Sequence, residues 1–177
     1  MADRIRKRTK YLTVSAMLCA LGVIFLALGA FIEVLDITTA VLASLLCVYA
    51  VIEMGGAYPW GVWVVTSLLS LLLLPVKTPA FFYALFAGFY PILKEKLEKL
   101  SRPLSLVLKL ILFHLSLGAI WLVLRLFFPD QLSLDGIEWL PIAMYALCVG
   151  TFVLYDIALT RVITVYLVRF RQRFRIK

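Results

Sequence analysis

Residues 11–32 read YLTVSAMLCALGVIFLALGAFI, a run of 22 residues without a charged side chain. An α-helix needs about 20 apolar residues to cross the roughly 30 Å hydrocarbon core of a bilayer. This run is therefore long enough for one membrane-spanning helix. Five further apolar runs follow, and together the six predict helices over residues 11–32, 37–53, 57–74, 79–93, 103–128 and 138–165.

The composition excludes a water-soluble globular domain. The chain has 177 residues, of which 64% are hydrophobic and 16% charged, and its mean hydropathy is +1.02. Soluble domains are roughly 45–50% apolar and about 25% charged, and disordered chains contain too few apolar residues to form a core. We therefore expect an all-α integral membrane protein that forms a single membrane domain over residues 1–177.

The fourth run is short for a span, so five helices are the main alternative to six. Pro75 and Pro79 separate it from the third run, because proline is disfavoured in a helix interior. We expect the fourth helix to continue past Pro91 into the amphipathic stretch 94–100.

Basic residues form three clusters that six helices would bring to one face. Lys and Arg are enriched in cytoplasmic loops, so this topology places both termini in the cytoplasm. Anionic lipid at the basic clusters explains the net charge of +8. No nucleic-acid partner is expected, because the basic residues flank the spans. The clusters are Arg4, Arg6, Lys7, Arg8 and Lys10; Lys94, Lys96, Lys99 and Arg102; and Arg169, Arg171, Arg173, Arg175 and Lys177.

Small side chains follow one face of the first predicted helix. Ala16, Ala20, Val23, Ala27 and Ala30 recur at spacings of three and four residues, which puts them on one side of a helix. Small residues let helix backbones approach closely in lipid. Two interpretations stay open, namely packing within this chain and docking against a second membrane protein.

Polar and aromatic residues share one face of the fifth predicted helix. His114, Gly118, Trp121 and Arg125 follow at intervals of four, three and four residues. Ionisable residues inside a membrane usually face a bundle interior or a cavity. Alternatively, Arg125 extends to the outer interface with Trp121 as an interfacial aromatic residue, and His114 is a hydrogen-bonded packing residue.

Further aromatic and polar residues are expected on the same outer side. Phe82 and Tyr83 closely follow Lys77 and Thr78, and Tyr145 falls in the outer half of the sixth predicted helix. An interfacial aromatic belt is one explanation. The other is a pocket for a planar, partly anionic ligand, since ligand pockets combine apolar walls with a few placed polar groups.

No catalytic or metal-binding motif occurs in the sequence. A single histidine excludes the His-Glu-x-x-His zinc motif, and the glycine-rich nucleotide loop and the Gly-x-Ser-x-Gly motif are absent. Cys19, Cys47 and Cys148 stand singly in apolar runs and are interpreted as small buried hydrophobic residues. We therefore expect no enzymatic activity, no metal and no cofactor.

The opening of the chain resembles a family of bacterial membrane proteins. Residues 6–21, RKRTKYLTVSAMLCAL, combine a basic stretch, the Leu12-Thr13 step and an Ala-x-x-x-Ala motif formed by Ala16 and Ala20. In this motif, in length and in predicted topology the chain resembles the substrate-binding S components of energy-coupling-factor (ECF) transporters. The resemblance implies a multi-pass protein of a bacterial cell membrane.

The resemblance also implies partners and a site. In the family, the Ala-x-x-x-Ala face contacts a transmembrane coupling protein bound to two ATPase subunits, so Ala16 and Ala20 would be docking residues and any ATP hydrolysis would occur in partner subunits. Family members bind a vitamin or other micronutrient on the outer side, between the outer halves of helices four to six and the loops after helices one and three. Assigned by region, with His114 added from the polar face, the solute-binding residues are Glu33, Asp36, Lys77, Thr78, Phe82, Tyr83, His114, Trp121, Arg125 and Tyr145.

The solute itself stays open, because no fingerprint for riboflavin, thiamine or biotin and no N-terminal metal-binding histidine occurs. Lys77 and Arg125 favour a solute with a carboxylate or phosphate group. The alternative function is a non-transporting scaffold subunit of a cell-envelope or cell-shape complex. A membrane enzyme or lipid-modifying protein is a third alternative.

Overall fold

The computed structural model describes residues 2–127 and 140–170, and its regular secondary structure is entirely helical over these ranges. The predicted all-α class is confirmed for this part of the chain. The residues form two compact units, Met1–Leu112 and Phe113–Lys177, which are described separately.

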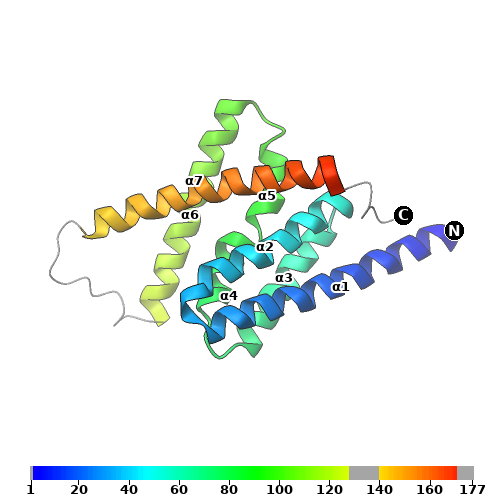
Figure 1. Cartoon of the computed structure of the whole chain (residues 1–177), viewed down its shortest axis with the longest axis horizontal. Coiled ribbons are helices and arrows are strands. Elements are labelled where there is room, and N and C mark those ends of the chain that lie inside the picture. The colour runs from blue at the N-terminus through cyan, green and yellow to red at the C-terminus, as the bar shows by residue number, and fades with distance from the viewer. Residues whose placement is uncertain (1, 128–139, 171–177) are drawn as a thin grey trace. The chain divides into compact units, whose positions relative to one another are not determined.

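The first unit contains most of the helices. It begins with α1 (Ala2–Phe31), the 3-10 turn η1 (Glu33–Leu35), α2 (Asp36–Glu53) and α3 (Tyr58–Leu73) (Figure 1). The short helix α4 (Thr78–Phe82), the π-helical turn η2 (Tyr83–Ala87) and α5 (Tyr90–Leu97) follow. The next helix, α6 (Arg102–Phe127), starts in the first unit and ends in the second, where α7 (Leu140–Val165) and the π-helical turn η4 (Tyr166–Phe170) complete the described chain.

Helix α2 is the central element of the first unit. It packs against α1, against α3 and against the segment formed by α4, η2 and α5 (Figure 1). Its buried side chains are small, which lets neighbouring backbones approach closely where lipid gives no hydrophobic drive to associate. These side chains are Thr39, Ala40, Ala43, Ser44, Cys47, Val48 and Ala50.

Helix α1 packs through glycine and small residues, but not through the whole predicted stripe. Gly22 and Gly29 are buried, and a methyl group at either position would overlap the side chain of Thr66 or Thr39, respectively. Ala30 is buried, whereas Ala16 and Ala20 are exposed. Internal packing therefore accounts for the end of the stripe near Ala30, and the described chain does not cover its beginning.

The predicted fourth helix is broken into three pieces. The backbone N–H of Gly88 donates to the Tyr83 carbonyl at 2.8 Å, which closes the π-helical turn. Pro91 follows, and proline cannot donate the backbone hydrogen bond that would continue a regular helix. The segment nevertheless continues past Pro91 as expected, because α5 ends at Leu97.

Within residues 2–127 and 140–170, four helical segments are long and apolar enough to cross a membrane: Ile5–Phe31, Asp36–Glu53, Arg102–Val123 and Ile142–Arg169. Tyr58–Leu73 is a shorter apolar helix, and its 16 residues rise about 24 Å at 1.5 Å per residue. The broken segment between Thr78 and Leu97 contains no single helix of that length. The predicted boundaries at 128 and 138 lie outside the described residues.

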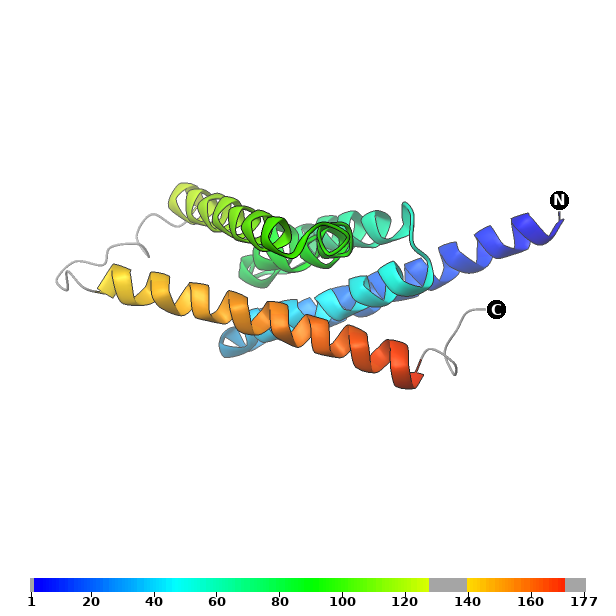
Figure 2. The same ribbon diagram turned by 90° about the horizontal axis from the view of Figure 1, so that it is seen from above.

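The first two basic clusters lie at the same end of the first unit, which we call the basic end. The Tyr11 ring is in edge-to-face contact with the Tyr58 ring at 5.3 Å, and the Lys96 ammonium group lies 5.7 Å from the centre of the Trp60 ring. These contacts bring together the start of the predicted α1 span, the start of α3 and the end of α5. The N-terminal part of α1 extends beyond α2 and α3 in both views (Figure 2). Lys and Arg are good helix formers, so the helix starts well before Tyr11.

Candidate functional site

The predicted solute-binding residues are divided between the two units. Glu33, Asp36, Lys77, Thr78, Phe82 and Tyr83 belong to the first, and His114, Trp121, Arg125 and Tyr145 to the second. Within the second unit, the structure joins the four residues as two contacting pairs.

The first pair connects α6 to α7. The Nε2 atom of His114 lies 2.6 Å from the Tyr145 hydroxyl oxygen, which is hydrogen-bonding distance. Both side chains are exposed. One residue before His114, the Phe113 ring is buried and stacks on Phe152 of α7, with 4.5 Å between ring centres. The aromatic stack joins the two helices where they come close to each other, and the imidazole–phenol pair lies beside it.

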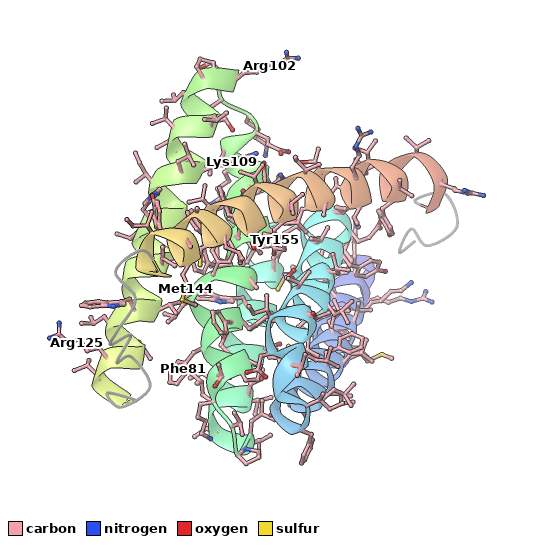
Figure 3. The ribbon with its side chains drawn as sticks, turned by 60° about the vertical axis from the view of Figure 1, so that its left-hand side comes forward. Phe81, Arg102, Lys109, Arg125, Met144 and Tyr155 are labelled. Carbon is pink, nitrogen blue, oxygen red and sulfur yellow. The ribbon has the colours of Figure 1, made fainter. Side chains whose placement is uncertain are left out.

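The second pair lies nearer the end of α6. The Arg125 guanidinium group lies 5.2 Å from the centre of the Trp121 ring, within the range of a cation–π interaction. Figure 3 shows Arg102 and Arg125 at opposite ends of α6. The helix rises about 16 Å from His114 to Arg125 at 1.5 Å per residue. The pair therefore lies well beyond His114 towards one end of the helix.

The predicted polar stripe of α6 is exposed along its whole length. His114, Gly118, Trp121 and Arg125 are all exposed, and a methyl group at Gly118 would have open space around it. A cation, an indole and an imidazole thus share one accessible face, with the Tyr145 phenol beside it. Such a face has the groups needed to bind a planar acid, because guanidinium pairs with carboxylate or phosphate and aromatic rings stack on planar molecules.

Lys77, the cationic site residue predicted for the first unit, is hydrogen-bonded within the chain. Lys77 donates a hydrogen bond from its ammonium group to the backbone carbonyl of Leu74, at the end of α3. Cations are favourable at this position, because the last carbonyl groups of a helix lack partners. Thr78 is the first residue of α4 and Asp36 the first residue of α2, and both side chains are half-buried. Glu33 lies in η1.

The two predicted aromatic residues of the first unit differ in exposure. Phe82 is half-buried against the core, whereas Tyr83 is 1% exposed and its hydroxyl oxygen lies 3.1 Å from the Cys47 sulfur. The Tyr83 side chain therefore belongs to the core of the first unit. The spacing of residues in the sequence could have indicated this burial. Small and aromatic residues recur at intervals of three, four and three residues, and the structure buries all of them: Ala80, Tyr83, Ala87 and Tyr90.

A polar cluster in the core of the first unit was missing from the sequence-based prediction. Cys19 and Cys47 are buried free thiols, as expected of small hydrophobic residues, whereas Cys148 is only half-buried. Cys19 and Cys47 nevertheless make polar contacts. The Cys19 sulfur donates to the Val62 carbonyl of α3 at 3.8 Å, and the Cys47 sulfur of α2 lies 3.1 Å from the Tyr83 hydroxyl oxygen of η2. Polar side chains between membrane helices stabilise their association, so this cluster is structural.

Two other kinds of site, a metal site and an open hollow, are less well supported than the exposed face of α6. Among the described residues, no group of three or more His, Cys, Asp or Glu side chains is placed to hold a metal ion. An open hollow on α7 and η4 is lined by Arg161, Val162, Val165 and Tyr166, and none of these is a predicted site residue.

The exposed face of α6, with Tyr145 of α7, is therefore the strongest candidate for a binding site in the described chain. Comparison of the chain with protein-family models, with curated proteins and with solved structures finds no match.

Proposed function

We propose that this chain is a membrane-embedded solute-binding subunit of the ECF type. It captures a small, planar, acidic, vitamin-like molecule on the outer side of a bacterial cell membrane and delivers it inward with an ATP-driven coupling partner. In this proposal six segments cross the membrane, both termini are cytoplasmic, and the basic end of the first unit faces the anionic inner leaflet. The observation that supports it best is the exposed polar face of α6.

The depth that the exposed polar face of α6 would have in a membrane favours a bound ligand on it. If Arg102 lies at the inner interface, His114 lies about 18 Å further along α6, near mid-membrane, and Arg125 about 35 Å along, near the outer interface. Polar groups in hydrocarbon are costly unless they line a cavity or meet a partner. The His114–Tyr145 pair is exposed at that depth, so lipid chains alone are a poor environment for it.

The arrangement of the groups indicates the kind of solute. Arg125 provides a planar pair of donors for a carboxylate or phosphate. Trp121 and Tyr145 provide aromatic surface, and the His114–Tyr145 pair can donate or accept a hydrogen bond. A planar ring carrying an acidic group would use all of these, with its acid near the outer interface and its ring deeper.

The exposed part of α1 supports a partner helix. Ala16 and Ala20 are uncovered by the described chain, and small residues at such positions allow a helix of another protein to approach closely. This is the surface that a transmembrane coupling protein would contact. ATP hydrolysis would then be carried out by ATPase subunits bound to that protein.

A scaffold subunit of an envelope complex is the second candidate function, and the same alanine surface favours it. In that case the Arg125–Trp121 pair is an interfacial anchor, with the guanidinium group extended to the lipid headgroups. The two candidates differ in one measurable property, because only the first binds a small solute.

A thermal-shift experiment tests the proposal. The purified protein in detergent is heated with a panel of carboxylate- and phosphate-bearing micronutrients. Binding to the native state adds RT ln(1 + [L]/Kd), about 2.7 kcal/mol at 100 times Kd, so one compound should raise Tm by several degrees. Arg125→Gln should remove this shift, and Arg102→Gln, at the other end of the same helix, should leave it unchanged. A panel without any shift would favour the scaffold, and equal losses in the two variants would mean that the solute does not bind through Arg125 at the exposed face of α6.

A further inference from the structure

A ladder of aromatic rings leads inward from one lysine at the basic end of the first unit. The Lys96 ammonium group lies over the Trp60 ring at 5.7 Å. Trp60 is in edge-to-face contact with Trp63 at 5.6 Å, and Trp63 with Phe89 at 5.9 Å. The three rings are half-buried, so each keeps part of its surface open to the surroundings of the protein.

Lys96 differs from its neighbours on the same helical segment. The Lys94 ammonium group is 3.2 Å from a Glu98 carboxylate oxygen, and the Lys99 ammonium group is 2.8 Å from Glu95. Among the described residues Lys96 has no acidic partner, and its side chain is exposed. An ammonium group over a ring face keeps N–H donors directed away from the ring, so Lys96 can bind an anion without first breaking an ion pair.

The Trp63 ring is fixed in its orientation. Its indole nitrogen donates to the Ala84 carbonyl of η2 at 3.1 Å. This hydrogen bond connects α3 to the broken fourth segment and holds the middle ring of the ladder in place. The ladder is therefore a preformed apolar surface, with one available cation at its outer edge.

The positions of the ammonium group and the aromatic rings along the helices match the order of headgroup and acyl chain in a lipid. Trp60 lies in the first turn of α3 and Lys96 in the last turn of α5, at the end where indole and ammonium groups favour the membrane–water interface. Trp63 lies about 4.5 Å further along α3, and Phe89 precedes α5, whose end carries Lys96. Charge is thus placed at headgroup level and aromatic surface at the level of the first part of an acyl chain.

We propose that Lys96 and Trp60 form a binding site for the phosphate headgroup of an anionic phospholipid, whose acyl chain lies along Trp63 and Phe89. The site is separate from the exposed face of α6 and does not depend on the solute-binding function. Because the cation and the apolar surface are adjacent, the matching ligand is amphiphilic. A free phosphate ion would use the lysine and leave the ladder unoccupied.

Native mass spectrometry of the full chain in detergent tests the site directly. Phosphatidylglycerol and phosphatidylcholine of equal chain length are titrated, and the apparent Kd of the first bound lipid is measured for each. One basic residue near an anionic lipid surface contributes about 1 kcal/mol, or about fivefold in affinity. Lys96→Gln should weaken phosphatidylglycerol binding by about fivefold and leave phosphatidylcholine binding unchanged.

Lys99→Gln is the matched control, because it removes the same charge from the same end but from a side chain paired with Glu95. It should change the affinity less than twofold. Lys96→Arg should retain the affinity, since arginine also stacks on indole, and Trp60→Leu should lower it. Circular dichroism confirms that each variant is folded.

Three outcomes would overturn the proposal: unchanged phosphatidylglycerol affinity in Lys96→Gln, equal losses in Lys96→Gln and Lys99→Gln, or displacement of the lipid by millimolar inorganic phosphate. The second would indicate general electrostatic attraction at the basic end, and the third a site for a soluble anion. None of these results bears on the thermal shift with micronutrients, so the two proposals fail independently.

Discussion

The imidazole of His114 and the hydroxyl group of Tyr145 lie 2.6 Å apart on neighbouring helices, 31 residues apart in the chain. Neither side chain is buried. The Phe113–Phe152 stack beside them provides apolar packing between the same two helices, so α6 and α7 are joined by an apolar contact as well as by the polar pair. Because the pair lies beside this stack and stays exposed, it is suited to orient a ligand.

Tyr145→Phe should therefore weaken solute binding and leave the protein folded. The variant keeps the ring and loses only the hydroxyl group, and a hydrogen bond contributes about 0.5–1.5 kcal/mol, so Kd is expected to rise by about two- to thirteenfold. Calorimetric titration with the solute found in the thermal-shift panel measures it. Tyr58→Phe, at the basic end, should bind normally. Full affinity in Tyr145→Phe would remove the pair from the binding site.

Replacement of Ala16 and Ala20 by leucine should abolish co-purification with a coupling partner and leave solute binding intact. Both positions are exposed on α1, so the larger side chains have room in the isolated chain and obstruct only an approaching helix. Pull-down from membranes of the producing organism, followed by protein identification, gives the readout.

Ala158→Leu, at an exposed position of α7, is the control for added bulk on the surface. Ala43→Leu is the contrasting variant, because Ala43 is completely buried on α2 and overpacking costs about 1–3 kcal/mol. Retention of the partner by the Ala16 and Ala20 variant would show that this surface is not the docking site.

The sequence predicted the helices better than the faces they bury. Long apolar runs indicated the class and placed the ends of α2 and α3 within about one residue, because apolar length and flanking Gly, Pro and charged residues are local signals. The break at η2 was not predicted. At this turn Gly88 lies so close to Trp63 and Tyr83 that an added methyl group would overlap both side chains, and such contacts between and within segments are not specified by any local pattern.

The site residues show the same limit. A polar stripe on α6 was visible from spacing alone, and it is exposed as one face. Lys77 and Tyr83 were placed in the site by region, and the structure shows one bound to a helix end and the other in the core. Regional assignment cannot distinguish a lysine that caps its own helix from one that faces a ligand, since both lie at the same depth.

Gly29→Ala should destabilise the protein, whereas Gly150→Ala should not. An added methyl group at Gly29 would overlap Thr39 of α2 and lie close to Pro79 of α4, whereas at Gly150 it would meet open space. Both glycines are helical, so the gain in helix propensity of up to about 1 kcal/mol is common to the pair. Thermal unfolding in detergent should give a lower Tm for the first variant and an equal or higher Tm for the second. Equal Tm values would contradict the close packing of α1, α2 and α4.

Glu98→Gln should destabilise the first unit more than Glu95→Gln. Two lysines converge on one Glu98 carboxylate oxygen, Lys94 of α5 at 3.2 Å and Lys109 of α6 at 3.4 Å, and the Lys94 side chain is fully buried. Loss of the carboxylate leaves two cations facing each other, one of them shielded from water. Because Glu98 itself is 42% exposed, solvent screening reduces the effect, and we expect about 1–2 kcal/mol. In the part of the chain that the structure describes, Glu95 pairs with the exposed Lys99, and such surface pairs contribute about 0–1 kcal/mol. Chemical denaturation in mixed micelles measures the free energy of unfolding of both variants.

Added salt should reduce the loss of stability in Glu95→Gln by a larger fraction than in Glu98→Gln, since buried charges are screened less. A larger loss of stability in Glu95→Gln than in Glu98→Gln would contradict the role of Glu98 in joining α5 to α6.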